Sequence, residues 1–301
     1  MISVVVPAYN EEENLPLLYQ EVKKYLDGED WELIIVNDGS SDTTEEVIKN
    51  LNKQDKRVKG ISLSRNFGHQ AAILAGLTYS SGDAIIIMDA DMQYPPSTIP
   101  EFIKKWREGY EVVHGVAVYR EDPLLKKLFA HWFYRFFYKV GIKTPHHSAD
   151  FCLISKRVRD ILILLPEKRK FLRALRTWSG FRQAIVYHER KARIKGEAKY
   201  TFLKSLSLAI DGILSFSFFP LRLVFFLGLF LTLFSLLIII WGIIMYVAGR
   251  TVHGWTSLLV LLVFFSGVQL LSLSVIGEYI GRIYEEVKGR PPFLVDKTIG
   301  I

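Results

Sequence analysis

Short apolar runs alternate with amphipathic stretches over the first part of the chain. Three runs, at residues 2–6, 31–36 and 84–88, are rich in branched aliphatic residues and have the length of buried strands. Residues 13–26 and 70–79 instead have the helical pattern of apolar positions. Strands that alternate with helices indicate a parallel sheet with both faces covered. The sequence therefore predicts an α/β fold with a mainly parallel sheet.

The pattern of hydrophobic and polar positions changes near residue 218. Leu223 to Ala248 contains no charged residue, and a second uncharged run extends from Trp255 to Gly277. Each run exceeds the roughly 20 residues that a helix needs to cross about 30 Å of hydrocarbon. We therefore expect two transmembrane helices joined by the short linker 249–254.

The distribution of positive charge predicts the orientation of these two runs. The linker contains one permanently charged basic residue, Arg250, whereas several basic residues flank the outer ends of the runs. These flanking residues are Lys204, Arg222, Arg282, Lys288 and Arg290. By the positive-inside rule, we expect both chain termini and the large N-terminal domain on the cytoplasmic side of the membrane.

The overall charge limits the classes of partner. A formal net charge of +7 favours an anionic partner, which could be lipid head groups, a phosphorylated substrate or nucleic acid. The sequence has no zinc-finger or basic-zipper pattern, so we expect no nucleic-acid partner. Cys152 is the single cysteine, which excludes an intrachain disulfide and a cysteine metal cluster. We expect Cys152 to be a small packed residue and not a nucleophile, because no activating base can be assigned to it.

Two stretches mix aromatic or apolar residues with basic ones. Leu124–Val140 contains Phe, Trp and Tyr together with four basic residues, as expected for a helix in the membrane interface. The alternative is a core-facing helix with a basic outer face. A second stretch of this kind, residues 200–222, leads directly into the first apolar run.

Polar clusters follow each of the three predicted strands, at residues 7–11, 37–42 and 89–91. In parallel sheets, ligands bind beyond the carboxyl ends of the strands, so these clusters should converge. Asp89 and Asp91 are two positions apart and should point to the same side. Two adjacent carboxylates repel unless a cation lies beside them, and their oxygen ligands suit Mg²⁺ or Mn²⁺. The alternative is that both are turn residues ahead of a pair of prolines.

The usual nucleotide-binding motifs are missing. No G-x-G-x-x-G follows the first strand, and no P-loop sequence is present. The chain instead contains "VVVPAYNEEENL", "VNDGSSDTT", "SRNFGHQAAILAGL", "GDAIIIMDADMQYPP" and "ADFCLIS", in this order and followed by the two apolar runs. Over nearly its whole length it resembles the polyprenyl-phosphate glycosyltransferases of glycosyltransferase family 2. It looks most similar to the bacterial undecaprenyl-phosphate glucosyltransferases, with dolichyl-phosphate mannose synthases as more distant relatives.

The resemblance implies a domain organisation. It implies a GT-A fold, which is a Rossmann-like α/β domain, followed by interfacial helices and two transmembrane helices. We expect a cytoplasmic catalytic domain at residues 1–199 and an amphipathic juxtamembrane segment at 200–222. A two-helix anchor is expected at 223–282 and a cytoplasmic C-terminal tail at 283–301. Small residues within the apolar runs could support packing between protomers, so we expect a homo-oligomer.

The resemblance also implies roles for individual residues. It places Pro7, Tyr9, Glu11 and Asp38 around the base and ribose of the nucleotide. We also expect Asp89 there, and Arg65 because of its place before a helix start. The metal ligands are expected to be Asp91 and Asp89, with Gln93 nearby in the region of the donor and acceptor. Asp150 is expected near the reacting sugar, as a base or as an orienting group. Arg65 precedes a predicted helix, whose first N–H groups could contact a phosphate. The alternative is that this loop only caps the helix.

Several basic residues lie shortly before the membrane runs. Their default interpretation is a solvated face, and the alternative is that some bind an anionic lipid phosphate. The runs are Lys168–Lys170, Arg173 with Arg176, and a later group between residues 190 and 199. The residues expected in the donor and acceptor region are Arg169, Arg173, Arg190, Arg193 and Lys199.

The implied reaction is an inverting transfer of glucose from UDP-glucose to undecaprenyl phosphate at the cytoplasmic face of the membrane, with Mg²⁺ or Mn²⁺ as cofactor. The partners are then a nucleotide sugar, a polyprenyl phosphate and the lipid bilayer, and the protein is a multi-pass protein of the cytoplasmic membrane. An alternative is the same chemistry with GDP-mannose, UDP-N-acetylglucosamine or an aminoarabinose nucleotide. A second alternative is a membrane scaffold with an inactive transferase domain.

Overall fold

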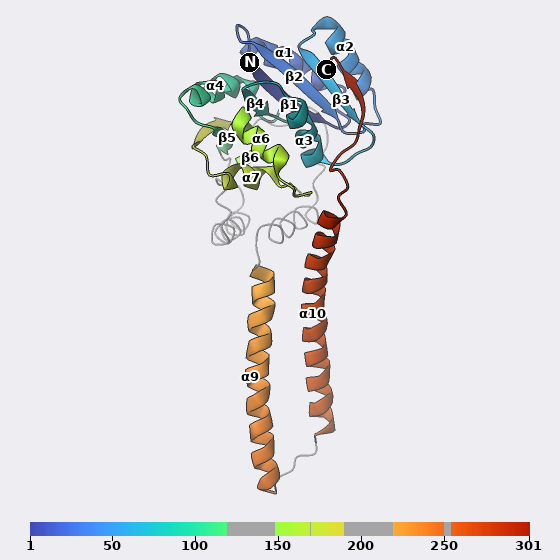
Figure 1. The fold of residues 1–301 in the computed structure, drawn as a ribbon, viewed down its shortest axis with the longest axis vertical. Coiled ribbons are helices and arrows are strands. Elements are labelled where there is room, and N and C mark those ends of the chain that lie inside the picture. Colours follow the sequence, from blue (N-terminus) through green and yellow to red (C-terminus); the bar gives the residue numbers. More distant parts are fainter. Residues whose placement is uncertain (119–147, 169, 190–218, 250–253) are drawn as a thin grey trace. The chain divides into compact units, whose positions relative to one another are not determined.

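The computed structural model describes residues 1–118, 148–168, 170–189, 219–249 and 254–301 (Figure 1). The chain divides into two compact units. The first unit comprises Met1–Thr201 together with Pro291–Ile301, and the second comprises Phe202–Arg290. The expected segment 124–140, most of the segment 200–222, and Arg169, Arg190, Arg193 and Lys199 lie outside the described residues.

The first unit is built on one eight-stranded sheet with the order β7-β5-β6-β4-β1-β2-β3-β8. The three predicted apolar runs form β1 (Ile2–Ala8), β2 (Trp31–Asn37) and β4 (Ala84–Ile87), and β3 is Val58–Leu63. These four strands are parallel to their neighbours within this group. The prediction of an α/β fold with a mainly parallel sheet is confirmed.

The remaining strands surround this parallel centre. They are β5 (Val112–Val118), β6 (Ser148–Ser155), β7 (Gln183–Glu189) and β8 (Val295–Ile299). Strand β6 runs antiparallel to both β4 and β5, whereas β7 is parallel to β5. Strand β6 therefore brings its start to the same edge of the sheet at which β4 ends.

Helices cover both faces of the sheet. They are α1 (Leu15–Tyr25), α2 (Thr44–Gln54), α3 (His69–Tyr79), α4 (Ile99–Arg107), α6 (Lys156–Leu164) and α7 (Leu172–Trp178), with the short 3₁₀ helix η1 (Pro96–Thr98). Val4 and Val6 of β1 lie in the core that α1, α2 and α4 complete. Val5 points to the other face, where it contacts Gly76 of α3 so closely that an added Cβ would lie 2.3 Å from its Cγ1. This alternation is the period-2 geometry of a strand buried on both sides.

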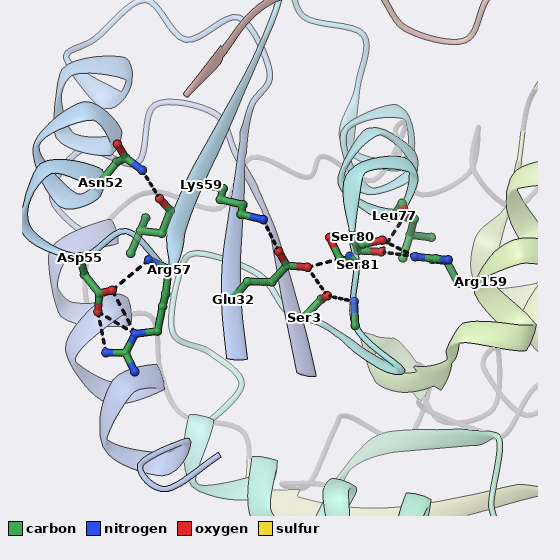
Figure 2. A network of polar contacts seen from close by, with 12 residues as sticks. Ser3, Glu32, Asn52, Asp55, Arg57, Lys59, Leu77, Ser80, Ser81 and Arg159 are labelled. Carbon is green, nitrogen blue, oxygen red and sulfur yellow. Dashed lines mark hydrogen bonds and ion pairs between the residues drawn. The ribbon is translucent and has the colours of Figure 1, made fainter. Parts of the chain in front are cut away.

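A buried polar network ties together the amino ends of the parallel strands (Figure 2). Glu32 of β2 accepts hydrogen bonds from Ser3 Oγ at 2.5 Å, from Lys59 Nζ at 2.7 Å and from the backbone N–H of Ser81 at 2.7 Å. Burial raises the pKa of Glu32, but these donors together outweigh it, so its pKa lies below the ordinary value. The network fixes the strand starts at the edge opposite the predicted site.

The C-terminal segment differs from its prediction as a tail over residues 283–301. Helix α10 continues to Val287, and residues Val295–Ile299 form β8, which pairs antiparallel with β3. Figure 1 shows this strand, in dark red, beside β3. The sequence did not indicate it because a five-residue edge strand with a polar centre has no strong hydrophobic pattern. The end of the chain therefore belongs to the first unit.

The second unit contains the two apolar runs as helices α9 (Phe219–Val247) and α10 (Trp255–Val287). Within the residues that the structure describes, one stretch, Phe264–Val287, is long and apolar enough to cross a membrane by length and composition. Leu223–Ser235 of α9 is a shorter apolar helix. Both runs are thus helical as predicted, but the prediction of two transmembrane helices is not confirmed.

Candidate active site

The loops after β1 and β2 are joined by hydrogen bonds. The backbone N–H of Asn10 donates to Ser40 Oγ at 2.9 Å, and the Asn10 side chain accepts from the backbone N–H of Ser41 at 2.8 Å. Asn10 has a φ of +55°, a left-handed conformation that asparagine tolerates better than most residues. The first two predicted polar clusters therefore meet, as expected for adjacent parallel strands.

Three of the residues expected around the nucleotide lie in or beside the β1 loop. Pro7 is buried within β1, where it pairs with Val36. Tyr9 lies exposed beyond the strand end, with 39% of its surface accessible. Glu11 is half-buried, and its carboxylate accepts a hydrogen bond from Asn14 Nδ2 at 2.7 Å.

Asp38 connects the β2 loop to the loop between β3 and α3. Its carboxylate accepts the backbone N–H groups of Phe67 at 2.7 Å and Gly68 at 2.9 Å. Burial raises the pKa of Asp38, and these two N–H groups only partly oppose that effect. Gly39 has a φ of +67°, and a Cβ there would lie 2.5 Å from the backbone carbon of Arg65. The close approach of the two loops therefore depends on glycine at position 39.

Arg65 lies exposed in the second of these loops. The centre of its guanidinium is 4.2 Å from the ring centroid of Phe67, which is a cation–π contact. The loop thus has a structural role in addition to any contact with a nucleotide.

Asp89 and Asp91 follow β4 as predicted. Asp89 Oδ1 lies 3.4 Å from His69 Nε2, and Asp91 Oδ1 accepts the backbone N–H of Gln93 at 3.2 Å. The intervening turn contains Met92 with a φ of +59°. Burial raises the pKa of Asp89 to about 6, the charge of His69 opposes this shift, and the charges of Asp150 and Asp91 reinforce it. The two predicted metal ligands are therefore close enough to repel each other electrostatically.

The donor set fits a hard divalent cation. Among the described residues, no group of three or more His, Cys, Asp and Glu side chains is arranged to hold a metal ion by itself. However, Asp89 Oδ1 is buried and accepts no hydrogen bond. Burial raises the pKa of Asp89, and the positive charges of His69 and Arg173 offset this effect only in part. Mg²⁺ and Mn²⁺ commonly take one or two protein carboxylates and complete their shells with water and substrate phosphates, which is what Asp89 and Asp91 could offer.

Asp150 of β6 lies beside this pair. The antiparallel register aligns Ile87 with Cys152, so two residues further along, Asp150 lies across from Asp89. Its Oδ2 accepts a hydrogen bond from Gln70 Nε2 at 3.0 Å and lies 3.4 Å from His69 Nε2. The third predicted carboxylate is therefore brought to the same strand end.

Two arginines of α7 also reach Asp150. Arg173 Nη2 lies 3.5 Å from Asp150 Oδ2, and Arg176 donates to the backbone carbonyl of Asp150 at 3.1 Å. Burial opposes ionisation of Asp150, but Arg173, His69 and Arg176 outweigh it and hold the pKa of Asp150 well below its usual range. Asp150 Oδ2 thus lies among several donors, whereas Oδ1 is buried and accepts no hydrogen bond from the described residues.

The default interpretation of two basic residues as a solvated face is wrong. Arg176 is fully buried and also donates to the sulfur of Cys152. Lys170 is buried because its ammonium donates to the backbone carbonyls of Leu162 at 2.7 Å and Ile163 at 2.9 Å, at the end of α6. Both cations replace water with backbone acceptors, which a charge count cannot reveal. The prediction that Cys152 is a packed residue is confirmed, because the thiol is buried. Burial raises its pKa to about 11.

Sequence reasoning missed His69 and Gln70 as site residues. Both lie in the first turn of α3, directly after the loop that Asp38 holds. The available signal was their place in "SRNFGHQ", where two polar side chains open a helix at the carboxyl edge of the sheet. Polar residues at a helix start are also typical of ordinary helix caps. The contacts of His69 with Asp89 and Asp150, and of Gln70 with Asp150, are what indicate a site and not only a cap.

Comparisons with known proteins agree with the geometry of the first unit. The family model for glycosyl transferase family 2 matches residues 3–162. The chain is 44% identical to the uncharacterized glycosyltransferase YkcC of Bacillus subtilis, covering 99% of this chain and 94% of that protein. It is 41% identical to the SfII prophage-derived bactoprenol glucosyl transferase of Shigella flexneri, covering 99% of this chain and 98% of that protein.

Solved structures show the same fold at lower identity. A crystal structure of glucosyl-3-phosphoglycerate synthase from Mycobacterium tuberculosis with uridine diphosphate has a TM-score of 0.54 and 20% identity, covering 72% of this chain and 78% of that one. Another structure of that synthase, with Mn²⁺, UDP-glucose and phosphoglyceric acid, has a TM-score of 0.53 and 20% identity, covering 71% of this chain and 77% of that one. At this identity the likeness identifies the GT-A fold.

Proposed function

Because the chain belongs to glycosyltransferase family 2, we propose that it transfers glucose from UDP-glucose to a polyprenyl phosphate, with inversion at the anomeric carbon. The observation that carries this proposal is the convergence of Asp89, Asp91 and Asp150 at one strand end in a chain about 40% identical to bactoprenol glucosyl transferases over its full length. Bactoprenol is undecaprenol, so undecaprenyl phosphate is the proposed acceptor.

The proposed chemistry is a single displacement. An oxygen of the acceptor phosphate forms a bond to the anomeric carbon, while the bond from that carbon to the β-phosphate oxygen of UDP-glucose breaks. The electron pair of the broken bond leaves with UDP. Asp89 and Asp91 would hold Mg²⁺ or Mn²⁺, which supplies Lewis-acid neutralisation of the diphosphate charge. Pro7, Tyr9, Glu11, Asp38 and Arg65 lie at the same strand ends, where the nucleotide is proposed to bind.

The acceptor needs little activation. The second pKa of a phosphate monoester is about 6, so the attacking oxygen is largely an anion at neutral pH. Asp150 is held as an anion by Arg173, His69 and Arg176, which makes it a weak base. Positioning and electrostatic stabilisation are therefore the main proposed contributions to catalysis.

The two apolar helices support a membrane location. Removing a polyprenyl chain from the bilayer costs about 0.8 kcal/mol for each CH₂ group, so the enzyme must act at the membrane surface. We infer that α9 and α10 anchor the catalytic unit, with both termini in the cytoplasm, according to the charge distribution around the two runs. The small residues Gly228 and Gly267 within these helices could support a homo-oligomer.

The test is a transfer assay with a choice of donors. The purified full chain is incubated with a short polyprenyl phosphate and a panel of nucleotide sugars, with and without a chelator, and the lipid product is identified by mass spectrometry. We expect a hexosyl product from UDP-glucose that disappears with chelator and returns with Mn²⁺. If the lipid product forms from GDP-mannose, UDP-N-acetylglucosamine or an aminoarabinose nucleotide and not from UDP-glucose, the proposed donor is wrong.

A matched pair of variants tests the site. Asp91→Asn should lower turnover by orders of magnitude, roughly 10² to 10³-fold for the loss of one electrostatic contact to the reacting groups. Asp30→Asn removes an exposed aspartate just before β2 and should leave turnover unchanged. Near-normal transfer by folded Asp91→Asn contradicts the metal role. Absence of metal-dependent nucleotide-sugar binding in the wild type would favour a scaffold.

A further inference from the structure

We propose that Gln70 and Asp150 form a polar clamp that positions Arg173 on the phosphate of the acceptor, and that Asp150 is a positioning residue and not a general base. This inference rests on the proposed transfer to a polyprenyl phosphate. It assigns a role to Gln70, which lies at the second position of α3 and is half-buried.

Gln70 uses both ends of its side-chain amide. Its Nε2 donates to Asp150 Oδ2 at 3.0 Å, and its Oε1 accepts the backbone N–H of Leu172 at 3.2 Å. Leu172 is the first residue of α7, where N–H groups have no partner within the helix. One side chain therefore joins three elements, α3, β6 and α7. Neither an apolar residue nor a charged residue at position 70 can make both hydrogen bonds.

Asp150 completes the clamp from the other side. Its carboxylate contacts His69, Gln70 and Arg173, and its backbone carbonyl accepts from Arg176 one turn further along α7. Side chain and backbone of one residue thus fix two successive turns of α7. All three side-chain contacts are made to Oδ2, so this oxygen is already engaged in holding His69, Gln70 and Arg173 in place.

The clamp positions Arg173 to contact the acceptor phosphate. Its side chain is 30% exposed, and its charge acts on Asp89 and His69 as well as on Asp150, so it lies within the carboxylate cluster. A guanidinium has five N–H donors in a planar fork, so it can contact a carboxylate and a phosphate together. The acceptor phosphate must approach the same cluster to reach the donor sugar, and Arg173 supplies the matching positive charge there.

The experiment exchanges the two functional groups of the clamp. Gln70→Glu puts two carboxylates in contact and should weaken the clamp, because the new side chain cannot donate to Asp150. The double variant Gln70→Glu with Asp150→Asn restores an amide-to-carboxylate hydrogen bond with donor and acceptor reversed. Its carboxylate can still accept the N–H of Leu172, and the net charge equals that of the wild type. Gln20→Glu, on the exposed surface of α1, is the matched control.

Three measurements separate the possible results. They are the KM and kcat of transfer, the Kd for a short polyprenyl phosphate in the presence of UDP, and hydrogen exchange of the amides of Leu172–Trp178. For Gln70→Glu we expect faster exchange in α7 and a KM and Kd for the lipid phosphate about tenfold higher, the effect of one hydrogen bond to a charged group. The KM for UDP-glucose should stay within about twofold, since the nucleotide loops are untouched. The double variant should recover only part of the loss, because it restores the hydrogen bond between positions 70 and 150 but removes the carboxylate that Arg173 contacts. Gln20→Glu should match the wild type.

Two results would overturn the inference. One is an unchanged lipid-phosphate Kd and α7 exchange in Gln70→Glu. The other is a double variant with restored α7 protection and lipid-phosphate Kd but no turnover, which would show that Asp150 must act as a base. Gln70→Ala adds no charge and should change Kd and exchange in the same direction if Gln70→Glu does not fold. Failure of the proposed function is distinct, because the wild type itself would then transfer no sugar to the lipid phosphate, whatever the variants do.

Discussion

We expect the charge of Asp89 to destabilise the metal-free protein, so its removal should stabilise the fold and abolish the proposed transfer. The carboxylate lies at the end of β4 with Asp91 and Asp150 nearby, and His69 contributes the nearest positive charge. Asp89→Asn keeps the size of the side chain and removes its negative charge. The substitution therefore isolates the electrostatic cost of the site.

The magnitude follows from the pKa. Burial raises the pKa of Asp89 from 3.8 to about 6, and each pKa unit corresponds to 1.36 kcal/mol, so the ionised group costs about 2 to 3 kcal/mol at neutral pH. For a domain of this size, about 2–4 °C of Tm accompanies each kcal/mol. We expect Asp89→Asn to raise the Tm of the metal-free protein by roughly 5 to 10 °C at pH 7.5.

The sign of the pH dependence follows from proton binding. Between pH 4 and 6 the folded protein retains a proton on Asp89 that the unfolded chain has lost, so stability falls as pH rises through this interval. Above about pH 6 both states are ionised and the cost is complete. Burial disfavours the charged form of His69, but the hydrogen bond to Asp150 and the charges of Asp89 and Asp150 outweigh burial and raise the pKa of His69. The Tm difference between variant and wild type should therefore be small at pH 4 and full above pH 6.5.

The assay is thermal unfolding of the detergent-solubilised full chain, with chelator, from pH 4 to 8. Asp30→Asn, which changes an exposed aspartate before β2, is the control and should leave Tm unchanged at every pH. Saturating Mn²⁺ should raise the Tm of the wild type and leave that of Asp89→Asn nearly unchanged, because ligand binding stabilises only the state that binds it. A Tm increase of equal size at pH 4 and pH 8, or a Tm below that of the wild type, would refute the reasoning.

Three further predictions concern other parts of the first unit. Gly39→Ala should raise the KM for UDP-glucose at least about fivefold and cost about 1–2 kcal/mol of stability, because its Cβ meets the backbone at Arg65; an unchanged KM in a transfer assay contradicts this. Glu32→Ala should destabilise the domain by about 3–5 kcal/mol because it leaves Lys59 partly buried without its carboxylate; denaturant unfolding that shows a loss below about 1 kcal/mol contradicts this. Cys152 should react with iodoacetamide only after unfolding, since burial raises its pKa to about 11; rapid labelling of the native protein would show an open site.

The local pattern of the sequence was sufficient for the centre of the sheet. The runs that form β1, β2 and β4 are apolar at nearly every position because both of their faces are covered. The residues that follow a parallel strand necessarily lie at the carboxyl edge of the sheet, so Asp38, Asp89 and Asp91 could be assigned to one site. The parallel topology could be predicted because the alternation of strands and helices is a local pattern and because helical connections favour parallel pairing.

Only the tertiary structure decided what surrounds those carboxylates. Asp150 is 80 residues from Gln70 along the chain, and it reaches the site because β6 inserts antiparallel beside β4. Arg176 is buried because its guanidinium finds acceptors on β6, although its sequence neighbourhood is that of a solvated helix. Strand β8 likewise has too weak a hydrophobic pattern to predict, and it exists because β3 offers an unpaired edge. Periodicity reports which face of an element is covered, but the partner of a buried charge depends on pairings between distant segments, which no local pattern encodes.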